Sequence, residues 1–125
     1  FVAREASHAV WDATTGVPSG TDGFLILRGT NGLLRVRYDG PEKKVQGLKR
    51  SVQKLPTGTQ QSAFLIEDTP GQMEIKEFAL NFSPAGDPVE ARVYVKIETK
   101  DKNRVEERVF TATAPLLNRR RYKYD

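Results

Sequence analysis

Hydrophobic residues at the start of the chain recur at helical spacing. They fall at intervals of three and four residues, at Ala3, Ala6, Val10 and Ala13. The segment 14–16, Thr-Thr-Gly, favours a C-terminal stop, so we expect residues 1–13 to form a helix. Isolated helices of this length are marginal in water, and this one must therefore pack on the rest of the protein. The residues expected to make that helix–sheet contact are Val2, Ala6, Val10 and Trp11.

From residue 24 onward the apolar positions alternate with polar ones, which is typical of half-buried strands. The segments with strand character are 24–28, 34–39, 45–54, 62–67, 72–83, 89–98 and 105–114. The pattern predicts an α+β fold in which the N-terminal helix packs on an antiparallel sheet of about six or seven strands over residues 24–114. Residues 115–125 follow as a basic tail, and 1–125 form one domain.

Three local signals refine the expected sheet. The turn Gly29-Thr30-Asn31-Gly32 joins the first two strands as a hairpin. Apolar residues change parity within 72–83, which predicts a β-bulge near Lys76-Glu77. The most regular strand is 89–98, where the residues expected to face the core are Val89, Ala91, Val93, Val95 and Ile97.

The composition narrows the chemistry. The 125 residues are 38% hydrophobic, as expected for a soluble globular domain, and they contain no cysteine and a single histidine, His8. The absence of cysteine excludes disulfides, thiolate zinc sites and Cys-His nucleophiles, and a single histidine excludes HExxH. A Ser-His-Asp triad could use only His8, which we expect to be structural. We therefore expect a non-enzymatic protein with no cofactor, no metal and no small-molecule substrate.

The net charge of +4 conceals a segregation along the chain. Residues 41–66 carry five basic side chains against one acidic, whereas 67–107 carry ten acidic against six basic. One interpretation is that these blocks are solvated faces of neighbouring strands that attract each other. The other is that they are complementary docking patches between subunits. The residues assigned to such a subunit interface are Lys43, Lys44, Lys49 and Arg50, opposite Glu74, Glu77, Glu90 and Glu98.

The C-terminal tail interleaves cations with aromatic rings. It combines phosphate neutralisation with base stacking, as a single-stranded nucleic-acid site requires, and its candidate residues are Arg119, Arg120, Arg121, Tyr122 and Lys123. The alternative is a strand-terminal basic tail that pairs with acidic neighbours or stays mobile.

Four runs of strand residues carry a resemblance to a known group. The runs are Phe64-Leu65-Ile66-Glu67, residues 75–82, residues 91–97 and the closing sequence at 110–119, Phe-Thr-Ala-Thr-Ala-Pro-Leu-Leu-Asn-Arg. Together with the initial helix, residues 62–119 resemble minor type IV pilins and type II secretion pseudopilins, particularly the larger J-like and W-like members. The segment 16–61 is compatible with that group in style only.

The resemblance implies a prepilin-type subunit whose long first helix has an apolar front half. In such proteins that half anchors the subunit in the cytoplasmic membrane and later packs in the filament core. Phe1 and Glu5 fall where mature pilins carry an N-methylated Phe and a Glu, but polar residues interrupt the apolar stretch that should follow. We therefore expect residues 1–13 to be the remnant of that helix, without its membrane-anchoring half.

The function implied by the resemblance is assembly or priming of a type IV pilus or type II pseudopilus at the cell surface or in the periplasm. The expected partners are other pilin or pseudopilin subunits. Two alternatives remain open. One is a DNA-binding subunit for DNA uptake, and the other is a cell-adhesion head with an exposed aromatic platform at Tyr38, Tyr122 or Tyr124.

Overall fold

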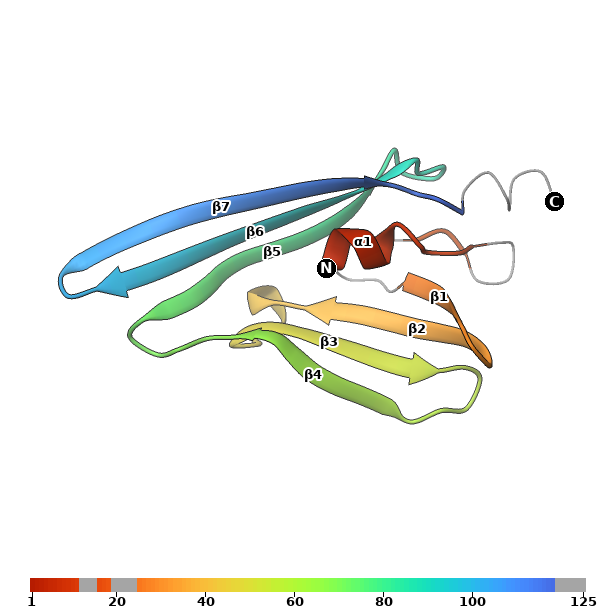
Figure 1. Cartoon of the computed structure of the whole chain (residues 1–125), viewed down its shortest axis with the longest axis horizontal. Coiled ribbons are helices and arrows are strands. Elements are labelled where there is room, and N and C mark those ends of the chain that lie inside the picture. The colour runs from red at the N-terminus through yellow and green to blue at the C-terminus, as the bar shows by residue number, and fades with distance from the viewer. Residues whose placement is uncertain (12–15, 19–24, 119–125) are drawn as a thin grey trace.

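The computed structural model describes residues 1–11, 16–18 and 25–118, and it is mostly β (Figure 1). A short helix, α1 (Val2–Ala6), precedes seven strands. The strands are β1 (Leu25–Gly29), β2 (Gly32–Asp39), β3 (Gly47–Lys54), β4 (Gln60–Glu67), β5 (Met73–Ser83), β6 (Glu90–Asp101) and β7 (Arg104–Pro115), with a 3-10 turn, η1 (Pro41–Lys43), between β2 and β3.

The strands form two antiparallel sheets, where the sequence pattern predicts one. The four-stranded sheet has the order β1-β2-β3-β4, and the three-stranded sheet has the order β5-β6-β7. The break falls between β4 and β5, where the Asp68 side chain accepts a hydrogen bond from the Ile75 N–H at 2.9 Å and Thr69 bridges to Met73. This tight connection turns the chain away from β4, so β5 pairs forward with β6 instead.

The helix is shorter than predicted. It ends at Ala6, where the Ser7 hydroxyl donates to the Arg4 carbonyl at 2.5 Å. The chain then passes through a turn at Ser7 and His8, and the Val10 N–H donates to the Ile26 carbonyl of β1 at 2.8 Å. The prediction of helix beyond Ala6 is therefore wrong for residues 7–11, because backbone bonding to β1 competes with the next helical turn. Residues 12 and 13 lie outside the described part.

The predicted helix–sheet contacts nonetheless involve the expected side chains. Ala6 is 0% and Val10 5% exposed, and Val2 and Trp11 are partly buried against the core. α1 lies where the two sheets face each other (Figure 1). The core draws on α1 and the segment after it, on both sheets and on the end of the chain, through Ala6, Ala9, Leu25, Val36, Tyr38, Leu48, Ile75, Phe78, Leu80, Ala91, Val93 and Leu116.

Two of the three local predictions are confirmed. Gly29 pairs with Gly32 across the expected hairpin turn. In β5 the register shifts between Ile75 and Glu77, which leaves Lys76 as the extra residue of the predicted bulge.

The third local prediction fails at its first residue. Ala91 and Val93 are buried as expected, and Val95 and Ile97 are partly buried. Val89, however, is 45% exposed and precedes the strand, which begins at Glu90. Pro88 is among the largest fully buried side chains and fills the core beside the start of β6.

Candidate functional site

A polar cluster on α1 fixes the helix to the four-stranded sheet. The Glu5 carboxylate of α1 accepts two hydrogen bonds from Arg50 of β3, from Nε at 2.8 Å and from Nη2 at 2.6 Å. The hydroxyl of Tyr38 on β2 donates to the same carboxylate. This bidentate, charge-assisted arrangement is among the strongest side-chain contacts available to proteins. We call Glu5, Tyr38 and Arg50 the helix clamp.

The clamp is mostly shielded from water. The Glu5 and Arg50 side chains are 14% and 25% exposed, and the Phe1 ring covers the guanidinium at 5.7 Å. Burial raises the pKa of the Tyr38 hydroxyl well above its usual range, and its hydrogen bond to the Glu5 carboxylate raises it further. The hydrogen bond to Glu5 also raises the pKa of Arg50. Because the three side chains bond one another, the clamp positions the helix.

Two sequence-based assignments change as a result. Tyr38 is 3% exposed, so the prediction that it belongs to an exposed aromatic platform is wrong. Its alternating position on β2 faces the core, where its ring lies 6.2 Å from that of Phe78. Arg50 was predicted to face a partner subunit, but its guanidinium forms an ion pair with Glu5 of its own chain.

The remaining predicted cations do not gather around Arg50. Lys49 precedes Arg50 on β3 and therefore lies on the opposite face of the sheet, with its ammonium 5.0 Å from the Phe64 ring centroid. Lys43 ends η1, and Lys44 follows it in the left-handed region with a φ of 62°. Arg50 thus lies on the inner face, whereas Lys43 and Lys44 are exposed beside η1.

The predicted glutamates share one face of the three-stranded sheet. Glu74 lies directly opposite Glu98, and Glu77 lies opposite Lys96. Glu90 stands at the other end of β6, opposite Ser83. Alternation along the strands places all of them on the face away from the core.

This face also supplies cations to its own carboxylates. Lys76 lies 3.3 Å from Glu74 and 3.9 Å from Glu98, and Arg92 Nε lies 2.7 Å from Glu90. The charge of Glu107, a hydrogen bond to it and the more distant charge of Glu77 raise the pKa of Lys96. The surface therefore alternates in sign, and docking of the basic residues onto it stays a prediction.

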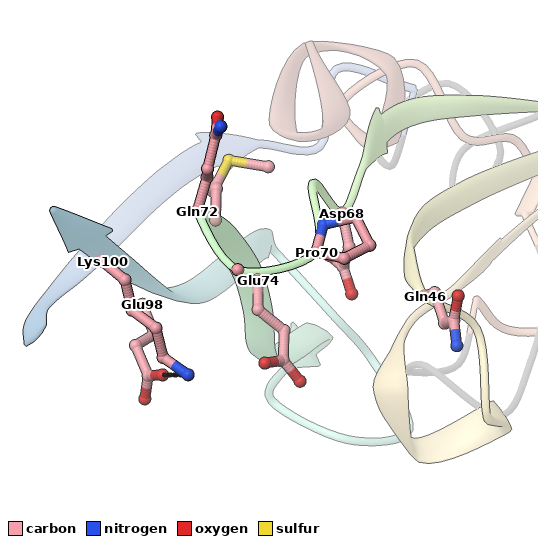
Figure 2. A pocket seen from close by; sticks show the side chains of 9 residues that line it. Gln46, Asp68, Pro70, Gln72, Glu74, Glu98 and Lys100 are labelled. Atoms are coloured by element: carbon pink, nitrogen blue, oxygen red, sulfur yellow. Dashed lines mark ion pairs between the residues drawn. The ribbon is translucent and has the colours of Figure 1, made fainter. Parts of the chain in front are cut away.

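A polar cleft of about 280 Å³ opens at the connection between the two sheets. Figure 2 shows Glu98 and Lys100 of β6 on one side and Gln46 on the other, with Asp68 and Pro70 between them. Lys100 lies 3.9 Å from Glu98, and Asp68 holds the Ile75 N–H. The carboxylates of Glu98 and Asp68 therefore already have partners within the chain.

The described residues also bear on metal and membrane sites. Within 1–11, 16–18 and 25–118, no three His, Cys, Asp or Glu side chains gather so as to hold a metal ion. None of the helices in those ranges has the length and apolar character to span a bilayer. The candidate nucleic-acid residues Arg119, Arg120, Arg121, Tyr122 and Lys123 lie outside the described part, as does Tyr124.

The resemblance to pilins drew attention to Glu5, but not as the partner of a buried cation, and no pattern singled out Asp68. Glu5 stands beside Ala6 in the apolar stripe of the helix, and an acidic residue there is a weak sign of a buried partner. That partner, Arg50, is 45 residues away in the chain, so no local spacing indicates the pair.

No known protein family, curated protein or solved structure matches this chain significantly. Neither a family nor an activity therefore passes to it from a relative. What indicates a function is the chain's own chemistry, with a helix locked to a sheet, charges of alternating sign on the outer face, and an exposed edge strand, β7.

Proposed function

We propose that the protein is a non-enzymatic subunit of an extracytoplasmic filament. The resemblance of residues 62–119 favours a minor type IV pilin or type II secretion pseudopilin that helps to assemble or prime the filament. The observation that supports this proposal most is the locking of the first helix onto the β-structure by the helix clamp.

A subunit that assembles through its first helix must hold that helix at a fixed angle to its head. Here Ala6 and Ala9 are completely buried, and the Glu5 carboxylate is bound from two strands. At the other end of the chain, the Leu117 N–H donates to the Ser7 carbonyl at 2.9 Å and the Asn118 amide donates to the His8 carbonyl at 2.9 Å. The opening segment is therefore fastened from both sides, which would transmit orientation from helix to head.

The gene upstream of Phe1 offers a direct test. The proposal expects a short basic leader, a Gly before the processing point and about 20 apolar residues leading into the helix. An upstream sequence that is polar or encodes another globular domain would overturn the membrane-anchored, filament-forming role.

A test in the source cell addresses assembly itself. Deletion of the gene should reduce the sheared filament fraction, and the wild-type gene should restore it. The Glu5→Ala variant should restore less, because the helix loses its fixed angle, whereas Glu42→Ala changes an exposed carboxylate on η1 and should restore fully. Equal filament yield with and without the gene would contradict the proposal.

The DNA-uptake alternative depends on residues 119–123, outside the described part. Retardation of DNA that weakens steeply with salt and disappears when residues 119–125 are removed would favour it. The adhesion alternative retains Tyr122 and Tyr124 as its candidate aromatic residues, since Tyr38 is buried.

A further inference from the structure

Exposed strand edges can pair with other chains, and three of the four sheet edges among the described residues are interrupted or covered. At β1, the Val10 N–H already bonds the Ile26 carbonyl. In β4, Leu48 pairs with Ile66 and Lys49 with Phe64, so Leu65 is an extra, bulged residue. In β5, Lys76 is the extra residue, and η1 packs beside the strand. Bulges and covering segments are common protections against edge-to-edge pairing.

Along residues 104–113 the fourth edge, β7, lacks these protections within the described residues, and the segment after α1 bonds its free side only beyond the strand, at Leu117. All twelve of its residues, from Arg104 to Pro115, pair with β6 without a register shift. Its residues 104–113 are all exposed, including Val105 at 58%, Val109 at 52% and Phe110 at 53%. Such a long, regular and partly apolar edge is suited to accepting another strand.

The hydrogen bonds reveal which backbone groups of β7 are directed outward. The Leu116 N–H donates to the Val89 carbonyl, and the same register continues along the β6–β7 pair. Because bonding alternates along an antiparallel strand, even-numbered residues bond β6 and odd-numbered ones direct their N–H and C=O groups to the free side. Pro115 is odd-numbered, so its missing N–H falls on the free side, where proline is tolerated.

We propose that β7 pairs in antiparallel fashion with β7 of a second copy of this chain, about a two-fold axis through Glu107. The odd-numbered residues then exchange backbone hydrogen bonds, and the three-stranded sheets join into one continuous sheet. The proposal does not depend on the filament role, because it uses only the edge of β7.

The side chains of β7 select this register and this occupant. Centred on Glu107, the pairing sets Glu106 opposite Arg108 of the second copy and Val105 opposite its Val109. It also sets Arg104 opposite the second copy's Phe110, a cation–π pairing, and two-fold symmetry repeats each of these contacts. Among registers centred on residues 106 to 109, the one at Glu107 alone pairs opposite charges.

Neighbouring registers are disfavoured. A pairing centred on Arg108 sets that guanidinium against its own copy, and one centred on residue 106 opposes Arg104 with the second Arg108. The chosen register has one like-charged contact, between the two Glu107 side chains. Each of them lies 3.4 Å from Lys96 of its own molecule, so two ammonium groups flank the pair.

Charge reversal tests both the pairing and its register. In Glu106→Arg and in Arg108→Glu, each homodimer contains two like-charged contacts, so sedimentation should show self-association about tenfold or more weaker than in the unchanged chain. Mixed in equal amounts, the two variants regain opposite charges at every contact and should form heterodimers. The double variant should self-associate like the unchanged chain.

A matched pair of control variants on β6 distinguishes this register from nonspecific attraction between charges. Glu90→Arg and Arg92→Glu make the same charge changes, at the same spacing, on β6. Each alone should dimerise as the unchanged chain does, and mixing them should add no association. A chain that stays monomeric at millimolar concentration overturns the proposal. A gain in association on mixing that is as large for the β6 pair as for the β7 pair does so as well.

Proline provides a backbone test. Val109→Pro removes an outward N–H without touching the bonds to β6, and it should abolish dimerisation with an unchanged circular dichroism spectrum. Val109→Thr keeps the N–H and should dimerise. Dimerisation of a folded Val109→Pro variant would overturn the use of this edge. Should the variant not fold, the charge-reversal series decides.

Discussion

The inward faces of the two sheets are covered to very different degrees. Phe78 of β5, Val95 of β6 and Phe110 of β7 lie in one cross-strand row on the same face. Phe78 is 4% exposed, Val95 is partly buried and Phe110 is 53% exposed. On the four-stranded sheet Leu25, Val36 and Tyr38 are all buried, in the core that this sheet shares with α1, β5 and β6. An apolar residue on the inward face is therefore buried only where another element lies over it.

The largest expected effect on stability comes from a substitution at the buried end of this row, at Phe78. Phe78→Ala should lower the free energy of unfolding by about 3–5 kcal/mol, because it opens a cavity beside Tyr38. Phe110→Ala should lower it by less than about 1 kcal/mol, because much of that ring is already in water. Urea unfolding measures both. Equal losses would contradict the gradient of burial along the row.

Substitutions in the helix clamp should cause the next largest loss of unfolding free energy. Glu5→Ala leaves a partly buried guanidinium and the Tyr38 hydroxyl without their acceptor, and we expect a loss of about 2–3 kcal/mol. In Glu5→Ala/Arg50→Ala the second substitution should cost less than it does alone, since the unpaired cation is gone. Additive losses in this double-mutant cycle would contradict the coupling.

Alkaline pH should lower the contribution that Tyr38 makes to folding stability. Because the pKa of Tyr38 is raised in the folded protein, its contribution is fully present below the unfolded value of about 10 and is lost as pH rises beyond it. The unchanged chain should thus lose more stability than Tyr38→Phe between about pH 9 and pH 11. Urea midpoints measure this, and parallel pH profiles of the two proteins would contradict it.

The smallest expected effect concerns β4, the edge strand of the four-stranded sheet. Lys49→Met removes an ammonium from the face of Phe64, a ring that is 40% exposed on β4, and should cost about 0.5 kcal/mol. The loss should disappear in a Phe64→Leu background, where no aromatic face remains. A loss that persists there would assign the effect of Lys49 to something other than the ring.

Local patterns predicted local features of the fold. The Asn31-Gly32 turn and the bulge at Lys76 depend on neighbouring residues, and both occur where they were expected. The helix boundary failed because Val10 bonds the backbone of β1, a contact made across a wide gap in sequence. The prediction of a single sheet failed because alternation along a strand does not reveal which strands pair, and β5 pairs with β6 and not with β4.

The candidate site was less accessible to such reasoning. Alternation placed Glu74 and Glu98 correctly on the outer face, but it could not reveal that Lys76 lies between them. Arg50 looks from the sequence like one more cation in a basic block. Its partner is on the helix, so burial of its charge depends on tertiary packing that no strand period encodes.

The fastening of Ser7 and His8 by Leu117 and Asn118 also bears on how the chain acquires its structure. The His8 and Asn118 partners are 110 residues apart, so this attachment closes a loop that contains all seven described strands. During synthesis residues 7 and 8 emerge before these strands, yet their final restraint becomes available only after β7 has left the ribosome. Docking of this segment is thereby a late event, completed by residues that follow the last described strand.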